Sequence, residues 1–131
     1  MDKPAAGKPY ALHAGEGWTY AWGPEFIVKA GEQGRRLAVA HMTTRAGEEP
    51  ADHTHSTEDE IFYLLSGSMT FRCGDETFEL ERDGFILLPQ GVQHGYTIRG
   101  AEDVRVLILT APADGAVAEG WGGIVGDLER G

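Results

Sequence analysis

The sequence predicts a single all-β domain, and three observations lead to this prediction. Glycine accounts for 19 of the 131 residues, twice the average usage of about 7%, and the glycines follow no three-residue period that would indicate collagen. Apolar residues make up 41% of the chain, which is enough to form a core. Short apolar runs alternate with turn signals every 8–12 residues or so, a rhythm typical of a sandwich or barrel.

Residues 1–24 are predicted to form an N-terminal arm or an edge strand. The stretch begins with a Pro-, Ala- and Gly-rich sequence that shows no sustained period. Trp18, Tyr20 and Trp22 then alternate at period 2. These three aromatic side chains could cover one end of the core, or they could form a dimer contact.

Residues 25–112 are predicted to form the β-domain itself. The predicted strands are Phe26–Lys29, Arg36–Thr44, Ile61–Leu65, Met69–Cys73, Thr77–Leu80, Phe85–Leu88, Gln93–Ile98 and Val104–Thr110. Turns are indicated at Gly31–Gly34, Ser66-Gly67, Gly74-Asp75 and between Pro89 and Gly91. Nothing in this range reads as a long helix, and residues 113–131 are predicted to be a C-terminal tail with at most one short helix.

Charge and composition argue against several classes of partner and location. Eleven Lys and Arg residues against 21 Asp and Glu residues give a net charge of −10, which disfavours nucleic acid and anionic membrane surfaces as partners. Cys73 is the only cysteine, so an intramolecular disulfide is excluded. The first residues lack the apolar stretch of a signal peptide, and no apolar run is long enough to span a membrane, so we expect a cytoplasmic protein.

Four side chains stand out as candidates for chemistry. His53 and His55 are two residues apart, so on an extended segment both imidazoles point to the same side. Glu60 opens the next apolar run, and His94 follows a Pro-x-Gly turn at the start of another. Three imidazoles and a carboxylate can bind a divalent first-row transition metal (Fe, Ni, Mn, Cu or Zn) and leave positions open for other ligands. Spacing alone leaves open whether His94 lies beside the first pair or whether His-x-His is a solvated turn.

The spacing of these residues resembles the two motifs of the cupin superfamily. The first motif is matched by Gly47, His53, His55, Glu60 and Gly67. The second is matched by Pro89-x-Gly91-x-x-His94. In two departures, Asp83-Gly84 stands where the family usually has Gly-Asp, and Ile98 stands where the second motif usually ends in asparagine.

The resemblance implies a specific fold and a specific ligand set. Small cupins form an antiparallel jelly-roll β-barrel of six to eight strands with the metal inside. Carried over to this sequence, the metal ligands are His53, His55, Glu60 and His94. Cupins of this kind usually dimerise, so the resemblance also implies a homodimer.

The sequence around the two motifs is most similar to that of quercetin 2,3-dioxygenase-like monocupins. This resemblance implies a metal-dependent dioxygenase that uses dioxygen to cleave a small aromatic or polyketide-like substrate. Glu60 would then serve both as metal ligand and as the catalytic base that accepts the proton of a substrate hydroxyl. Two alternatives stay open, namely a non-redox metal-dependent cyclase or isomerase, and a non-catalytic cupin that binds or senses a small molecule.

Strand alternation predicts which side chains accompany the ligands. Phe62 and Tyr96 are predicted to line the substrate pocket, and His41 joins them if its strand face points inward but is exposed otherwise. Leu64 and Ile98 share the inward face and are predicted to be ordinary core.

The remaining candidates receive simpler predictions. Met69, Phe71 and Phe85 are predicted to be packing residues. Glu58 and Asp59 are predicted to be solvated, with a role next to the metal ligands as the alternative.

Overall fold

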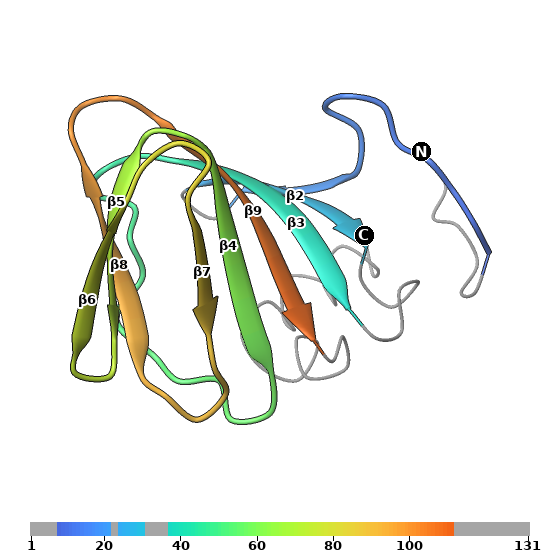
Figure 1. Cartoon of the computed structure of the whole chain (residues 1–131). Helices are drawn as coiled ribbons and strands as arrows, with labels where there is room; N and C mark the ends of the chain where they lie inside the picture. The colour runs from blue at the N-terminus through green and yellow to red at the C-terminus, as the bar shows by residue number, and fades with distance from the viewer. Residues whose placement is uncertain (1–7, 22–23, 31–36, 112–131) are drawn as a thin grey trace.

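The structure, a computed structural model, describes residues 8–21, 24–30 and 37–111, and all of its regular elements are β-strands (Figure 1). The strands are β1 (Trp18–Ala21), β2 (Glu25–Ala30), β3 (Ala38–Thr44), β4 (Asp59–Ser66), β5 (Ser68–Cys73), β6 (Glu76–Leu80), β7 (Phe85–Leu88), β8 (His94–Arg99) and β9 (Val104–Ala111). Within the described residues there is no helix long and apolar enough to cross a membrane. The turn predicted at Gly31–Gly34 and the tail predicted over 113–131 lie outside the described residues.

The strands form two sheets in which every described pairing is antiparallel. The larger sheet has the order β1-β2-β3-β9-β4-β7, and the smaller one has the order β6-β5-β8. The C-terminal strand β9 lies between β3 and β4, so distant parts of the chain are joined in one sheet. This arrangement confirms the predicted antiparallel jelly-roll fold.

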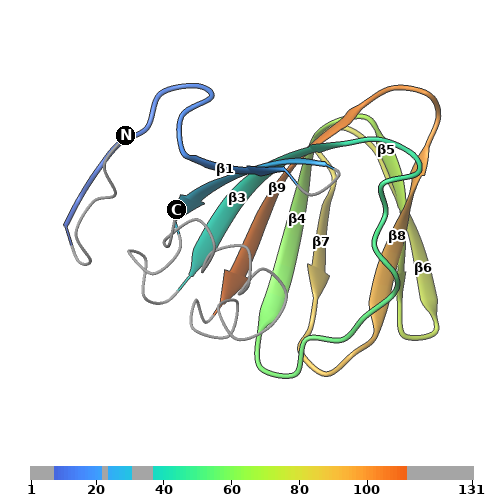
Figure 2. The ribbon, with the colours of Figure 1, turned by 180° about the vertical axis from the view of Figure 1, so that it is seen from behind.

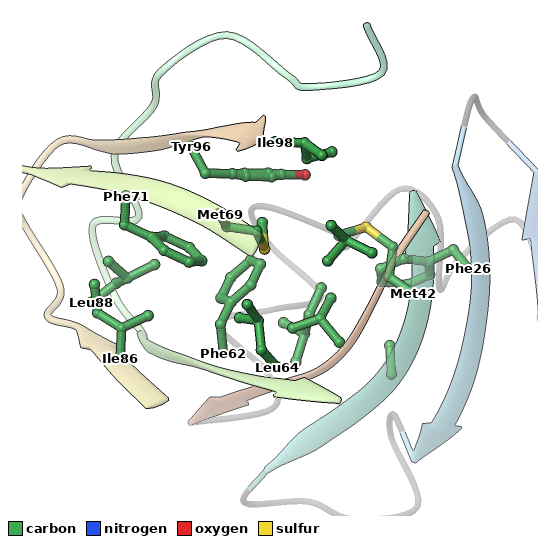
Figure 3. Close-up of a cluster of buried hydrophobic side chains, with 14 of the residues drawn as sticks. Phe26, Met42, Phe62, Leu64, Met69, Phe71, Ile86, Leu88, Tyr96 and Ile98 are labelled. Carbon is green, nitrogen blue, oxygen red and sulfur yellow. The ribbon is translucent and has the colours of Figure 1, made fainter. Parts of the chain in front are cut away.

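The core lies between the two sheets, and strand alternation fills it. On β3 the side chains of Ala38, Ala40 and Met42 are buried, whereas the alternate side chains of that strand are less so. Figure 3 shows Phe71, Met69, Tyr96 and Ile98 of the smaller sheet opposite Phe62, Leu64 and Met42 of the larger one. Leu64 and Ile98 are therefore core residues, as predicted.

Two turns show why particular residues stand at motif positions. Gly67 has a φ of 91°, and a Cβ atom there would lie 2.6 Å from Cγ2 of Val104, so the turn requires glycine. Asp83 takes the left-handed conformation with a φ of 68°, which aspartate tolerates better than most residues. A Cβ atom on Gly84 would lie 2.8 Å from the carbonyl oxygen of Glu81. The turn thus accommodates the Asp-Gly order that departs from the family pattern.

The prediction that Phe85 is a packing residue is wrong. β7 is an edge strand of the larger sheet, and the burial of its side chains alternates. Ile86 and Leu88 point into the core, whereas Phe85 is 55% exposed on the outer face. A short apolar run predicts a strand buried on both faces, but the outer face of β7 has no covering layer among the described residues.

The N-terminal strand β1 pairs with β2 at the other edge of the larger sheet. Trp18 is half-buried, and its ring meets Tyr10 edge-on with 6.5 Å between centroids. Tyr10 in turn donates a hydrogen bond of 2.6 Å to the carbonyl of Lys29. The side chain of Tyr20 and all of Trp22 lie outside the described residues.

Candidate metal centre

Three segments bring the four candidate ligands together. His53 and His55 come from the loop between β3 and β4, Glu60 from the start of β4, and His94 from the start of β8. The loop runs alongside β8 (Figure 2), and an isolated β-bridge joins them through His53 N–H to His94 O (2.9 Å) and His94 N–H to His53 O (2.8 Å). The backbone itself therefore places His94 next to the His-x-His pair.

The ligand atoms of these four residues converge on one point. One nitrogen or oxygen atom from each of His53, His55, Glu60 and His94 lies within 4.8 Å of the others. Oε1 of Glu60 is 3.3 Å from Nε2 of His94 and 3.7 Å from Nε2 of His55. All but His53 are buried, so polar atoms face one another inside the protein.

The outer nitrogens of two histidines have defined partners. Nδ1 of His53 is 2.8 Å from the carbonyl oxygen of Ala51. Nδ1 of His55 is 2.8 Å from Oε1 of Glu58. In both rings the outer contact is made through Nδ1, and this is an arrangement by which metal-binding histidines are oriented.

This donor set fits a divalent transition metal. Imidazole nitrogens and one carboxylate are ligands that iron, nickel, copper, zinc and manganese accept. Three of the four side chains are buried, and a cation at the point where their ligand atoms meet would offset the cost of removing these polar groups from water. The four residues predicted from the sequence thus form a cluster that could bind a metal.

An ion pair next to the cluster, which sequence reasoning missed, fixes the ligand-bearing loop. Asp52 receives two hydrogen bonds from Arg72 on β5, at 2.8 Å from Nη2 and 3.2 Å from Nε. Arg72 also donates to Oγ1 of Thr97 on β8 at 2.8 Å. The Arg72 hydrogen bond holds the pKa of Asp52 below its usual value. A side chain at Gly95 would collide with Asp52, so the glycine after His94 makes room for this contact.

A cavity of about 450 Å³ opens from the cluster into the apolar interior. Its wall consists of Phe26, Met42, Pro50, His53, Thr54, His55, Glu60, Phe62, Phe71, Leu88, His94, Gly95, Tyr96 and Ile108. The rings of Phe62, Phe71 and Tyr96 contact one another with centroid distances of 5.2–5.8 Å. Phe62 and Tyr96 therefore line the cavity together with the candidate ligands.

Tyr96 brings a phenol into this apolar wall. Only 6% of the residue is exposed, and Figure 3 places its ring beside Phe71 and Ile98. Burial raises the pKa of the Tyr96 phenol well above its usual value, and the negative charge of Glu60 adds to the effect. The hydroxyl therefore stays protonated at neutral pH and can donate a hydrogen bond.

His41 does not line the pocket, so of its two predicted placements the inward one is wrong. Met42 takes the inward position on β3, so the alternation turns His41 to the outer face of the larger sheet. There its Nε2 lies 3.3 Å from Nη2 of Arg105. Partial burial lowers the pKa of His41, and the neighbouring positive charge of Arg105 lowers it further.

Glu58 is buried, so the prediction that its side chain is solvated is wrong. Its side chain has 0% exposure, whereas Asp59 is exposed and accepts a hydrogen bond of 2.9 Å from the backbone N–H of Gln90. Both residues stand in the same acidic stretch, so local composition does not separate them. Only the fold of the loop shows which carboxylate turns inward.

Comparisons with known proteins agree with this geometry. A family model described as a cupin domain matches residues 40–110. A tetracenomycin polyketide synthase protein, TcmJ of Streptomyces glaucescens, is 31% identical over 74 residues, which are 56% of this chain and 50% of the relative. The polyketide synthase CurC of Streptomyces cyaneus is 28% identical over 68 residues, covering 52% and 44%. The chain thus spans about half the length of these curated relatives.

Solved structures support the fold alone. A Thermotoga maritima protein described as a predicted oxalate decarboxylase superposes with a TM-score of 0.71 at 17% identity, over 79% of this chain and 99% of the other. A Klebsiella pneumoniae protein with a double-stranded β-helix domain gives a TM-score of 0.63 at 20% identity, over 73% and 83%.

Proposed function

Because the chain belongs to the cupin family, we propose that it is a metal-dependent enzyme acting on a small, flat organic molecule. The observation that carries this proposal is the convergence of three imidazoles and one carboxylate at the wall of an apolar cavity. His53, His55, Glu60 and His94 hold the metal. The bound ion supplies Lewis acidity and, if it is iron, nickel, copper or manganese, redox chemistry as well.

The proposed substrate is aromatic or polyketide-like. The cavity of about 450 Å³ falls within the range of small-molecule sites, and its wall away from the ligands is mostly aromatic and aliphatic. The names of two relatives, both polyketide synthase proteins, support a substrate of this chemical class. Flat rings would pack against Phe62 and Phe71.

The proposed reaction is a quercetinase-like cleavage by dioxygen. Glu60 accepts the acidic proton of a substrate hydroxyl, since its carboxylate is buried among the ligands at the cavity wall. Tyr96 stays protonated and donates a hydrogen bond to an oxygen atom of the substrate. The apolar wall excludes water from the reacting centre.

A non-redox cyclase or isomerase is the second candidate. It uses the same ligands and the same base, with the metal as Lewis acid, and the polyketide synthase relatives favour it. A protein that only binds or senses the ligand is the third.

Metal content and oxygen consumption separate these three functions. Elemental analysis of protein purified without a histidine tag is expected to find about one redox-active divalent ion per chain. Oxygen uptake is expected with a flavonol or a β-diketone. Conversion under strict anaerobiosis would instead support the cyclase or isomerase. Ligand binding without turnover in fully metallated protein would support the sensor.

The protein is further proposed to be a homodimer that pairs through the outer face of its larger sheet. Phe85 and Leu87 are 55% and 48% exposed there, and register places Tyr63 and Ile61 of β4 beside them. On the next strand, β9, Leu107 is the register partner of Tyr63 and Leu109 that of Ile61. A chain with a net charge of −10 repels its copies, and the apolar side chains of β7, β4 and β9, with His41 and Arg105 beside them, form a face without acidic side chains on these positions where two copies can approach.

Replacing Leu87 by lysine is expected to convert the dimer to a monomer, because a charge would be buried in the interface. Light scattering would measure a mass of about twice 14.2 kDa for the native protein and 14.2 kDa for the variant. Phe78→Lys is the control, since Phe78 is 39% exposed on β6 of the other sheet. A monomeric native protein, or a dimeric Leu87→Lys variant, would contradict this interface.

A further inference from the structure

Glu58 is buried together with the candidate metal ligands. Its side chain is 0% exposed, although it belongs to an acidic stretch of sequence. Among the described residues, four histidine or charged side chains are buried, namely His55, Glu58, Glu60 and His94. Three of them are candidate metal ligands. Glu58 is the fourth, and it is buried without being a member of the cluster.

The contact that Glu58 makes lies on the far side of His55 from the cluster. The chain bends at Ser56 and Thr57, which returns Glu58 towards the histidine three residues earlier. Oε1 of Glu58 lies 2.8 Å from Nδ1 of His55, while Nε2 of the same ring lies 3.7 Å from Glu60. Glu58 therefore reaches the cluster through the imidazole ring.

A carboxylate at this position has two physical consequences. It accepts the Nδ1 proton of His55, which fixes the tautomer and leaves the lone pair of Nε2 directed at the cluster. It also places a negative charge near the point where a cation would bind, in surroundings that screen charge less than water does. Both effects favour the binding of a divalent ion.

The other histidine of the pair provides a comparison. Nδ1 of His53 contacts the neutral backbone carbonyl of Ala51 at the same distance of 2.8 Å. His53 and His55 are therefore both oriented through Nδ1, but only the contact of His55 adds a full negative charge.

We propose that Glu58 is a positioning residue that orients His55 and raises the affinity of the centre for a divalent cation. This inference rests on the proposed metal site, but it does not depend on which reaction the site performs. Glu58 acts through His55, since its carboxylate meets Nδ1 and the cluster faces Nε2.

The test is a titration of the metal-free 131-residue chain with Zn²⁺ in competition with a chromophoric chelator. Glu58→Gln keeps the size and an acceptor oxygen but removes the charge, and it is expected to weaken Zn²⁺ binding about 10- to 100-fold. Asp59→Asn is the matched control, because it removes an exposed neighbouring charge and keeps the oxygen that accepts from Gln90. Its Zn²⁺ affinity is expected to equal that of the native chain. Equal affinities for Glu58→Gln and the native chain would overturn the proposal.

If circular dichroism shows that Glu58→Gln does not fold, a second variant is used in the same titration. Glu58→Asp keeps the charge but shortens the side chain by one methylene, so it no longer reaches Nδ1 of His55. Weaker binding and an altered Co²⁺ absorption spectrum are expected, and native values for both would overturn the proposal. If the native chain itself binds neither Zn²⁺ nor Co²⁺, the proposed metal site is wrong. Native binding with unaffected Glu58 variants refutes only the role of Glu58.

Discussion

Replacing Glu60 by glutamine is expected to lower turnover about 10²- to 10⁴-fold in protein that still holds its metal. The amide has nearly the same shape and keeps an oxygen that can coordinate, but it cannot accept a proton from a substrate hydroxyl. Glu60 is 5% exposed, its Oε1 is 3.3 Å from Nε2 of His94, and among the described residues it supplies the one carboxylate of the ligand cluster. The measurement is kcat at saturating substrate, with metal content determined on the same sample.

Asp59→Asn is the control for the loss of one negative charge. Asp59 is the next residue in the chain, is exposed and lies outside the ligand cluster, so its variant is expected to keep native turnover. A Glu60→Gln protein that retains its metal and its turnover would show that Glu60 is not the base. Loss of metal and turnover together would show that the Glu60 carboxylate is needed to hold the metal.

Most of the fold follows from local patterns in the sequence, but the pairing of strands does not. Alternation and turn residues predict β4, β5 and β7 to within two residues, because each signal lies within a few positions. The place of β9 between β3 and β4 depends on contacts between segments far apart in the sequence. The exposure of Phe85 has the same origin, since an apolar run does not reveal that its strand lies at a sheet edge.

The candidate site divides in a similar way. His53 and His55 face one side of an extended segment because of their spacing alone, whereas the proximity of His94 came from the motif resemblance and is seen in the His53–His94 bridge. The placement of His41 stayed open because period 2 separates two faces of β3 without stating which one is inward. Both faces carry apolar residues, so hydrophobicity does not decide between them.

The supporting contacts had no signal in the sequence. Arg72 follows Asp52 by 20 residues, and nothing in either local sequence indicates an ion pair. Glu58 was one of several acids in a hydrophilic loop. Such contacts form only once the loop is folded against β8, which explains why ligands were easier to predict than the residues that orient them.

Replacing Phe71 by alanine is expected to lower the free energy of unfolding by about 3–5 kcal/mol. Phe71 is 1% exposed on β5, and its ring lies 5.2 Å from that of Phe62 and 5.8 Å from that of Tyr96. Truncation removes the buried ring and leaves a void that merges with the existing cavity, which Phe71 lines. Urea denaturation of the metal-free protein measures the change, and Tm is expected to fall by roughly 10 °C or more.

Phe78→Ala is a matched control because it makes the same chemical change on the paired strand. Register places Phe78 directly opposite Phe71 on β6, but β6 is an edge strand and Phe78 is 39% exposed. Its replacement is expected to cost less than about 1 kcal/mol, since little apolar area returns to water. Equal losses for the two variants would mean that Phe71 is not packed between the sheets. A large loss for Phe71→Ala alone would show that the aromatic wall of the cavity also holds the two sheets together.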